Sequence, residues 1–283
     1  MEVLAPKRRQ SPLSSLLRKK SAIVGIGILA VVFITLAIGP LLIRTSPYTI
    51  FSTTNSPPSF SHLFGTDSQG HDLLSQIVYG AYPSLTLALE AAIGASVLGF
   101  FAGLCAGYFG KLETPISILT DAVLTYPVLP VVLLISSLFA SVSLLPIFLA
   151  LFLWAPICRA VRVQVIAVKK MPFVDASKTS GMDDLNVMMR IIAPEVVPLA
   201  IAYFILDVAI GVILITALEF LGIGNPNIVS WGSVLYWASR YGFDYGDWWW
   251  IIEPGVIISI VSMGFALVGF SVEEIMNPRL RGK

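Results

Sequence analysis

Residues Lys169–Pro194 have the sequence KKMPFVDASKTSGMDDLNVMMRIIAP and separate two long apolar runs. The segment carries seven charged side chains, and these are Lys169, Lys170, Asp175, Lys178, Asp183, Asp184 and Arg190. One charge at the centre of a membrane helix costs about 3 kcal/mol on insertion scales, so seven charges exclude burial in lipid. We therefore expect this segment to lie in water between two membrane spans.

The same segment carries signals for helix starts and helix ends. Pro172 suits a first helical position, where its missing N–H is not needed. Gly181 can adopt the left-handed conformation that ends a helix. Asp183 and Asp184 can then cap the first turn of a second helix and interact with its dipole. The pattern predicts two short helices that meet at a glycine corner, a shape suited to docking on another protein.

Composition places the whole chain in a membrane. Of its 283 residues 56% are hydrophobic and only 12% are charged, and the mean hydropathy is +0.85. A soluble domain is closer to a quarter charged. The two cysteines, Cys105 and Cys158, lie in apolar runs and are expected to be small buried hydrophobic residues. The net charge of +1 says nothing about partners, and we expect no nucleic-acid partner.

Apolar runs of adequate length predict six membrane-spanning helices, with the lipid bilayer as the chain's surroundings. A basic cytoplasmic leader (1–20) precedes the first helix (21–43). A forty-residue extracytoplasmic loop (44–84) contains a short amphipathic helix. A five-helix core (85–272) and a cytoplasmic tail (273–283) follow. The five core spans are expected at 85–109, 116–140, 144–168, 196–220 and 248–272.

Two patterns within the spans predict local geometry. Tyr126-Pro127 and Pro130 lie inside the third span, where we expect a kink or a break. Glycines recur on one face of the second span, at 94, 99, 103 and 107. Repeated small residues allow close helix approach, so this face is expected to be a packing seam.

Basic residues determine the expected orientation. With the N-terminus and C-terminus both inside, sixteen of the eighteen Lys and Arg residues are cytoplasmic, and only Arg44 and Arg240 are outside. The opposite orientation would violate the positive-inside rule. This orientation places the segment 169–194 in the cytoplasm.

The segment 169–194 also resembles a known motif. Asp175-Ala176-Ser177, Gly181, Ile191 and Ala193-Pro194 have the spacing of the EAA loop of ATP-binding-cassette importer permeases. The family pattern is Glu-Ala-Ala, three residues, Gly, nine residues, Ile, one residue, Leu-Pro. Asp175, Ser177 and Ala193 depart from it by small changes in volume. In that family the loop forms a coupling helix that fits into a groove of the ATPase subunit.

Three further phrases narrow the resemblance to the dipeptide/oligopeptide branch of these permeases. The motif FGTD-x-x-GHD with YGA (64–81) resembles the motif that opens the family core. His71 and Tyr82 each stand where the family has an Arg. FLGIG (220–224) with SWG (230–232) resembles FLGLG…SWG. NPRLR (277–281) resembles the family ending DPRLR. The resemblance covers roughly residues 60–283.

The resemblance implies an all-α membrane protein with six transmembrane helices and the type I importer permease (MetI-like) fold. It implies a second homologous permease, two cytoplasmic ATPase subunits that bind ATP and Mg, and an external solute-binding protein. The coupling residues would be Asp175, Ala176, Ser177, Gly181, Met182, Asp183, Ile191 and Pro194. The substrate would be a dipeptide or oligopeptide, with oligosaccharides or nickel as alternatives. The chain would reside in a prokaryotic cell membrane.

No enzyme signature accompanies these motifs. There is no phosphate-binding GxxxxGK[ST] and no HExxH, so ATP hydrolysis would require partner subunits, and we expect no cofactor or metal in this chain. His62 and His71 offer too few ligands for zinc. Two alternatives remain open, an intramembrane aspartyl protease using Asp121 and Asp207, and an ion-coupled carrier.

Several acidic residues and an aromatic cluster lie on the outer half of the spans. Asp207 lies near the middle of its span, and Glu90, Glu219 and Glu253 lie near the outer ends of theirs. They either pair locally or line an outer vestibule that holds a polar substrate. The aromatic residues of 236–250 are expected to form an interfacial belt.

Overall fold

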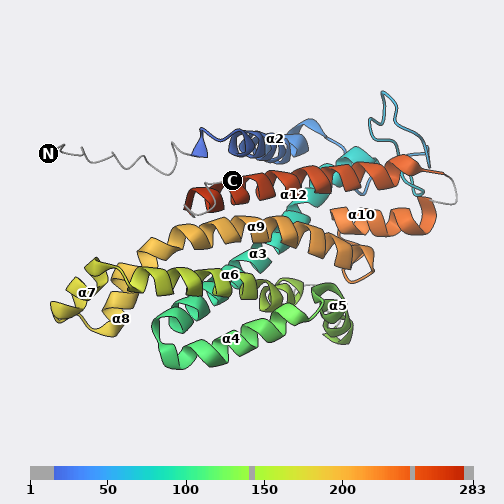
Figure 1. The fold of residues 1–283 in the computed structure, drawn as a ribbon. Coiled ribbons are helices and arrows are strands. Elements are labelled where there is room, and N and C mark those ends of the chain that lie inside the picture. Colours follow the sequence, from blue (N-terminus) through green and yellow to red (C-terminus); the bar gives the residue numbers. More distant parts are fainter. Residues whose placement is uncertain (1–15, 140–143, 243–245, 277–283) are drawn as a thin grey trace.

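The structure is a computed structural model that describes residues 16–139, 144–242 and 246–276. All regular elements in these ranges are helical. In chain order they are α2 (Lys20–Leu42), α3 (Leu73–Tyr108), α4 (Gly110–Thr125), α5 (Val128–Phe139), α6 (Leu145–Lys169), α7 (Pro172–Thr179), α8 (Asp184–Asn186), the π-helical turn η2 (Val187–Ile192), α9 (Ala193–Phe220), α10 (Trp231–Trp237), the π-helical turn η3 (Ala238–Gly242) and α12 (Trp248–Met276). α7 and α8 lie at one end of the bundle and α10 lies at the other (Figure 1).

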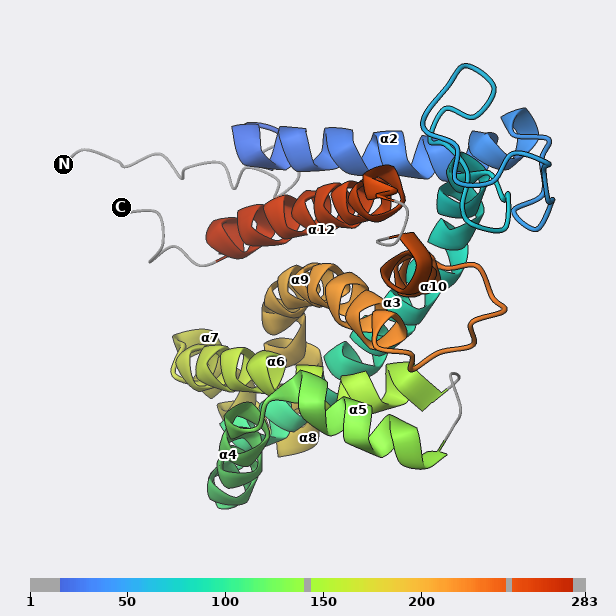
Figure 2. The same ribbon diagram turned by 90° about the vertical axis from the view of Figure 1, so that its right-hand side faces the viewer.

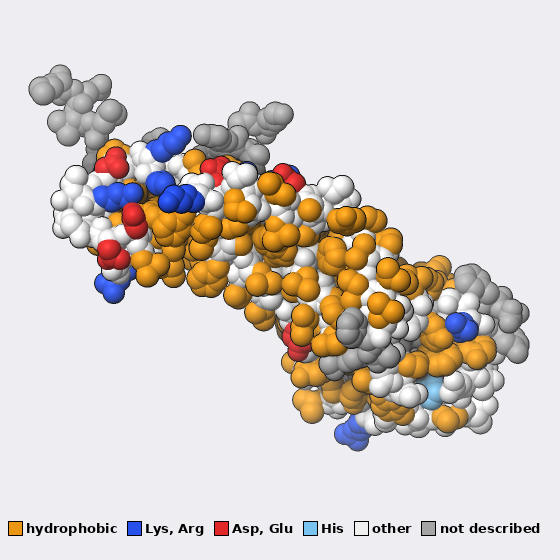
Figure 3. Space-filling view, turned by 90° about the horizontal axis from the view of Figure 1, so that it is seen from below, with side chains coloured by type: hydrophobic (Ala, Val, Ile, Leu, Met, Phe, Trp, Pro, Cys, Tyr) orange, Lys and Arg blue, Asp and Glu red, His pale blue; other side chains and the backbone are white. Residues whose placement is uncertain are grey.

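Five helices are long and apolar enough to cross a membrane, and α4 with α5 makes a sixth span if the bent pair is counted as one. The surface agrees with this assignment. A hydrophobic band covers the middle of the molecule, and charged side chains gather mainly at one end (Figure 3). The all-helical membrane fold expected from composition is therefore present in the described residues.

The third span is broken, as the prolines predict. α4 ends at Thr125, α5 begins at Val128, and the two helices meet at an angle of 89° (Figure 2). Pro127 disfavours the helical conformation of Tyr126, whose φ and ψ of −82° and 139° are extended. The break expected inside the third span is therefore present.

The second span begins earlier than expected. α3 starts at Leu73 rather than at Leu85, and it continues without interruption through Pro83 to Tyr108. The separate amphipathic helix expected in the loop 44–84 is therefore the first part of α3. Its polar residues Ser75 and Gln76 are buried and not exposed on a surface helix. Glu90 consequently lies near the middle of α3 rather than at its outer end.

Close packing between α3 and α6 forms the centre of the bundle. A methyl group at Gly99 would lie 2.6 Å from the backbone oxygen of Trp154, and one at Gly107 would lie 2.6 Å from Cβ of Val165. The glycine face of α3 is thus the packing seam that the spacing predicts. Such close approach maximises dispersion contacts between two helices where lipid supplies no hydrophobic driving force.

α2 lies on the outside of this bundle, along α12 (Figure 2). Ser21 and Ser271 are joined through their hydroxyls at 2.9 Å, and Lys19 pairs with Glu274 at 2.6 Å. The start of α2 therefore lies beside the end of α12. The leader residues 1–15 and the tail motif 277–281 lie outside the described residues.

The aromatic residues of 236–250 do not form one interfacial belt, which corrects that expectation. Trp249 and Trp250 are buried in an apolar cluster with Leu73 and Val234, whereas Trp248 remains 58% exposed. Because α10 folds back under α12, two indole rings become core. Tyr245, also assigned to the belt, lies outside the described residues.

We predict that Gly103→Ala destabilises the protein by about 1–3 kcal/mol, the usual cost of overpacking. Its new methyl group would lie 2.7 Å from Cβ of Val161 and 2.8 Å from the backbone oxygen of Cys158. Reversible unfolding in mixed detergent measures the change. The control is Gly110→Ala, whose methyl group would have no neighbour within 4 Å. Equal stability of the two variants would contradict the assignment of this glycine face as a tight packing seam between α3 and α6.

Candidate functional site

The charged segment 169–194 forms a corner between α6 and α9 at one end of the bundle (Figure 1). α7 begins at Pro172, its first helical position, as predicted. Gly181 follows with φ of +86°, and its N–H donates to Lys178 O at 3.0 Å. Only glycine adopts this left-handed conformation without steric cost, so Gly181 fixes the angle of the corner.

Asp183 caps the second helix. It accepts from the backbone N–H of Asn186 at 3.3 Å and also from the side-chain amide of Asn186. Hydrogen bonds from Asn186 lower the pKa of Asp183 below its ordinary value, because they stabilise the carboxylate. The expected second short helix is, however, not a separate element. α8 has three residues and continues through η2 into α9, so any movement of the corner passes directly into a membrane span.

The coupling residues assigned by resemblance divide by exposure. Asp175, Ala176, Gly181, Met182 and Asp183 are exposed at the tip of the corner. Ser177 and Ile191 are half-buried, and Pro194 is exposed in the first turn of α9. The tip therefore carries the residues available to a partner, whereas Ser177 and Ile191 face the protein.

Apolar side chains accompany the charges at this corner. Val174, Val187 and Ile192 are fully buried and join the main hydrophobic core. Other apolar side chains remain exposed, and these are Met171, Phe173, Met182, Leu185 and Met189. The corner thus has one face fixed to the bundle and another apolar face open to contact.

Tyr108, the last residue of α3, fixes the corner to the bundle. Its hydroxyl donates to Asp184 Oδ1, and its backbone oxygen accepts from Lys169 Nζ at 2.6 Å. Lys169 and Lys178 also lie over its ring, at 5.0 and 5.2 Å from the centroid. A cation over an aromatic face is stabilised by the ring quadrupole. Sequence reasoning missed Tyr108, because nothing local to it indicates that α6, α7 and α8 converge there.

The opposite end of α3 is capped by the phrase FGTD-x-x-GHD. Asp67 accepts from the backbone N–H groups of Gln69 and His71 at 2.8 Å and from the side chain of Gln76 at 3.1 Å. His71 Nδ1 lies 2.8 Å from Asp67 Oδ2, the oxygen that also accepts from Gln76. Asp72 accepts from the N–H of Ser75 at 2.8 Å and therefore caps the helix. These residues hold the outer loop on the start of α3.

The two histidines serve this cap rather than a shared site. His62 Nδ1 lies 2.8 Å from Asp72, whereas His71 contacts Asp67. Across the described ranges, no three His, Cys, Asp or Glu side chains are grouped to hold a metal ion.

The SWG motif (230–232) connects Glu219, near the end of α9, to α3. Ser230 Oγ donates to Glu219 Oε2 at 2.8 Å, and the N–H of Trp231 donates to Ser84 Oγ at 3.0 Å. The indole of Trp231 donates to Ile77 O at 2.9 Å. We call this set, Glu219, Ser230, Trp231, Ser84 and Ile77, the outer lock. It joins the end of α9 to α3 through buried polar groups.

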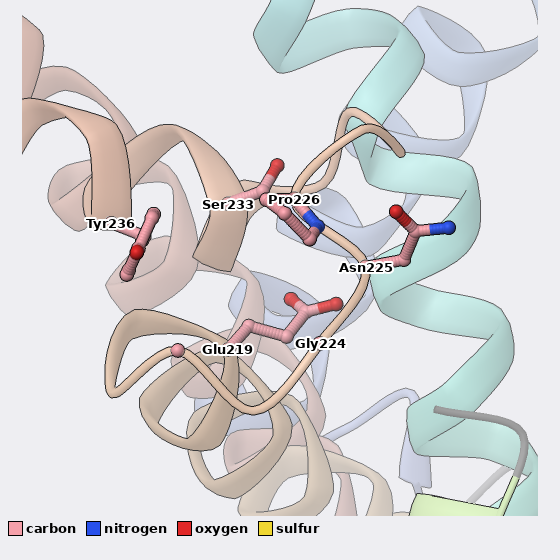
Figure 4. A pocket seen from close by; sticks show the side chains of 7 residues that line it. Glu219, Gly224, Asn225, Pro226, Ser233 and Tyr236 are labelled. Atoms are coloured by element: carbon pink, nitrogen blue, oxygen red, sulfur yellow. The ribbon is translucent and has the colours of Figure 1, made fainter. Parts of the chain in front are cut away.

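The four candidate acids on the substrate path lie in different surroundings. Glu219 is 8% exposed and lines a small cavity of about 40 Å³, with its carboxylate directed toward the turn at Asn225 and Pro226 (Figure 4). Asp207 is 2% exposed in the middle of α9. Glu90 is exposed on α3, and Glu253 is half-buried on α12. No hydrogen bond between any two of these four acids is found in the described part of the chain.

The positions of Asp121 and Asp207 do not support an intramembrane aspartyl protease. Asp121 is 64% exposed on α4 and pairs with Arg159 of α6, whereas Asp207 is enclosed in α9. An aspartyl dyad requires two carboxylates that share a proton. Within the described residues one carboxylate is exposed and paired with an arginine and the other is buried, so they form no dyad.

We predict that Tyr108→Phe loosens the corner. The variant retains the ring but loses the hydrogen bond to Asp184, so backbone amides of residues 181–187 should exchange about fivefold faster, the effect of one ordinary hydrogen bond. Hydrogen–deuterium exchange measures this. Tyr79→Phe is the matched control at the outer end of α3, where the hydroxyl contacts Pro40 O and Ile43 O at 3.4 Å. Unchanged exchange in Tyr108→Phe would contradict the anchoring role.

Comparison with known proteins agrees with this architecture. Residues 95–282 match the family described as binding-protein-dependent transport system inner membrane component. The chain is 31% identical over 269 residues to the dipeptide transport system permease protein DppC of Alkalihalophilus pseudofirmus, covering 93% of this chain and 88% of the relative. It is 30% identical over 271 residues to DppC of Bacillus subtilis, covering 93% and 83%. A Brucella suis biovar 1 protein, provisionally named a peptide transport system permease, is 29% identical over 270 residues, covering 94% and 90%. The chain therefore belongs to the binding-protein-dependent transport system inner membrane components, as a multi-pass permease subunit of an ATP-binding-cassette importer.

Proposed function

We propose that the corner 169–194 is the docking element for a cytoplasmic ATPase subunit and that the importer carries peptides. The observation that supports docking most strongly is the combination of a rigid base and an open apolar face. Val174, Val187 and Tyr108 hold the corner on the bundle, while Phe173 and Leu185 are 47% and 61% exposed. A segment that is fixed to the bundle on one side and apolar on its exposed side can bind a partner. It can then transmit the partner's displacement to the membrane helices.

Orientation supports the same assignment. With both termini inside, the corner faces the cytoplasm, where ATP is available, and the basic residues obey the positive-inside rule. The described ends of α2 and α12 lie side by side, joined by Lys19 and Glu274. This arrangement suits an even number of crossings, and six crossings result when α4 and α5 count as one span.

The mechanism follows from the connection of the corner to long helices. ATP-driven closure of two ATPase subunits would displace the corner, and α9 would move with it because α8, η2 and α9 are continuous. α3 would follow through Tyr108. Rigid-body movement of packed helices is a common route to alternating access. A second permease subunit would supply the other wall of the path, and an external binding protein would deliver the substrate.

The peptide assignment is supported by the relatives. Those compared above are named for peptide or dipeptide transport and align over more than nine-tenths of this chain. These names favour peptides over oligosaccharides or nickel, and family membership favours an importer over an ion-coupled carrier.

The test is purification of the tagged chain from its native membrane in mild detergent, with identification of the copurifying proteins. We expect two ATPase subunits and a second six-span permease. Uptake by the reconstituted assembly would then be measured with dipeptides, oligosaccharides and nickel in parallel. A homomeric preparation without ATPases would overturn the docking role, and uptake of nickel or oligosaccharides alone would overturn the peptide assignment.

We predict that Gly181→Val lowers substrate uptake about tenfold while ATP hydrolysis continues. A β-branched residue in the left-handed region is strained by about 1–2 kcal/mol, so the corner should change its angle. No neighbour lies within 4 Å of a Cβ at this position, so the effect is conformational and not a clash. Uptake and hydrolysis by reconstituted assemblies are compared.

Gly181→Asn is the matched control, because Asn tolerates the left-handed conformation. It should retain most of the coupled uptake. Full coupling in Gly181→Val, or equal loss in both variants, would refute the conformational role of Gly181.

We also predict that Glu219→Gln lowers uptake by about tenfold, the lower range for loss of electrostatic steering of a charged substrate. Glutamine keeps an oxygen to accept from Ser230, so the outer lock should persist and assembly with the ATPases should be normal. Glu253→Gln tests the second outer acid, and Glu195→Gln, exposed at the first turn of α9, is the control. Normal uptake in both outer variants would remove these acids from the path.

A further inference from the structure

An apolar cavity of about 440 Å³ lies between α2 and the core helices α3 and α12. Its lining comes from α2 on one side and from the core on the other. The α2 residues are Gly27, Ile28, Val31, Val32, Thr35 and Leu36, and the core residues are Ile77, Val78, Ala81, Trp231, Ile257 and Ile260. Neither the corner 169–194 nor the candidate acids contribute to it.

The cavity exists because α2 touches the core tightly at two separated places. A methyl group at Gly25 would lie 2.9 Å from Gly264 O on α12, and one at Gly39 would lie 2.7 Å from Cγ1 of Val78 on α3. Between these contacts Leu29, Val32 and Leu36 still pack against the core, whereas a methyl group at Gly27 would meet nothing within 4 Å. Two close contacts therefore hold a gap open between them.

The chemistry of the lining excludes water and polar ligands. Thr35 carries the only side-chain polar group contributed by α2, and its hydroxyl donates to Val31 O at 2.8 Å. The indole N–H of Trp231 is bound to Ile77 O. A water molecule needs two to four polar partners, which this lining does not offer. An empty cavity is also unfavourable, because its walls lose their dispersion contacts.

The volume of the cavity and its position within the membrane indicate what can occupy it. α2 and α12 both meet the requirements for membrane spans, so the cavity lies where the surrounding medium is hydrocarbon. One turn of an α-helix, about 10 Å wide and 5.4 Å long, already occupies about 420 Å³, so the cavity cannot contain a further membrane-crossing helix. We propose that an acyl chain of a membrane phospholipid occupies this cavity and joins α2 to the core.

The proposed site has a consequence for the outer lock. Trp231 belongs both to the lining and to the outer lock, and Ile77 accepts its indole N–H. The acyl chain would therefore pack against the residues that connect α9 to α3. This inference does not depend on the substrate or on the ATPase partner.

The test uses Gly27→Leu, which fills the cavity from α2 without a clash. Gly255→Leu is the matched control, because it makes the same substitution at a helix glycine whose Cβ would also be free of neighbours, and it is not part of the lining. The full-length chain is reconstituted in phosphatidylethanolamine and phosphatidylglycerol vesicles whose acyl chains are dibrominated. Bromine atoms in the cavity would lie close to Trp231, which belongs to the lining and is only 1% exposed, and would quench its fluorescence.

We expect part of the tryptophan quenching to disappear in Gly27→Leu and to persist in Gly255→Leu. Native mass spectrometry of the detergent-washed chain gives an independent measurement. Wild type and Gly255→Leu should each retain one phospholipid that Gly27→Leu loses. If Gly27→Leu does not fold, Val31→Phe fills the same cavity from an exposed position.

Three outcomes would overturn the proposal. Quenching that is equal in Gly27→Leu and wild type would place the bromine atoms elsewhere. A washed wild-type chain that retains no phospholipid would show that no acyl chain is held. Loss of the phospholipid on association with a second permease would assign the cavity to a side chain of that partner.

Discussion

Close packing of α3 against α6 is the contact on which the other features depend. Glycines at 99, 103 and 107 bring the two backbones together, and any side chain there would force them apart. α3 has 36 residues, which at 1.5 Å per residue correspond to about 54 Å. Packed against α6, it connects the corner at one end of the bundle with the loop that precedes Leu73 at the other.

Each end of α3 is tied by polar groups rather than by apolar packing alone. At the end beside the corner, Tyr108 binds Asp184 and Lys169. At the outer end, Asp72 caps the helix, and Trp231 is bound to Ser84 and Ile77. Hydrogen bonds have narrow geometric requirements, so they define position more sharply than apolar contacts do. The family phrases FGTD-x-x-GHD and SWG are therefore structural in this chain, because they fasten loops to α3.

Prediction from sequence succeeded where the signal is local. The break at Tyr126-Pro127 follows from the steric demands of proline, and the corner at Gly181 follows from the freedom of glycine. The glycine face of α3 follows from helical periodicity alone. Prediction failed where burial depends on distant residues. A separate amphipathic helix is predicted before Leu85, yet α3 is continuous from Leu73 and buries Ser75 and Gln76. Trp249 and Trp250 suggested a membrane interface, yet α10 covers them.

The candidate site shows the same division. The sequence by itself determined that a charged, water-exposed corner stands between two apolar spans, because charge and proline or glycine punctuation act over a few residues. The anchoring of this corner by Tyr108 and the hydrogen bond between Ser230 and Glu219 became visible in the tertiary structure alone. Those relations join residues separated by many positions in the chain. Their distances depend on how helices pack, which no local pattern of residues specifies.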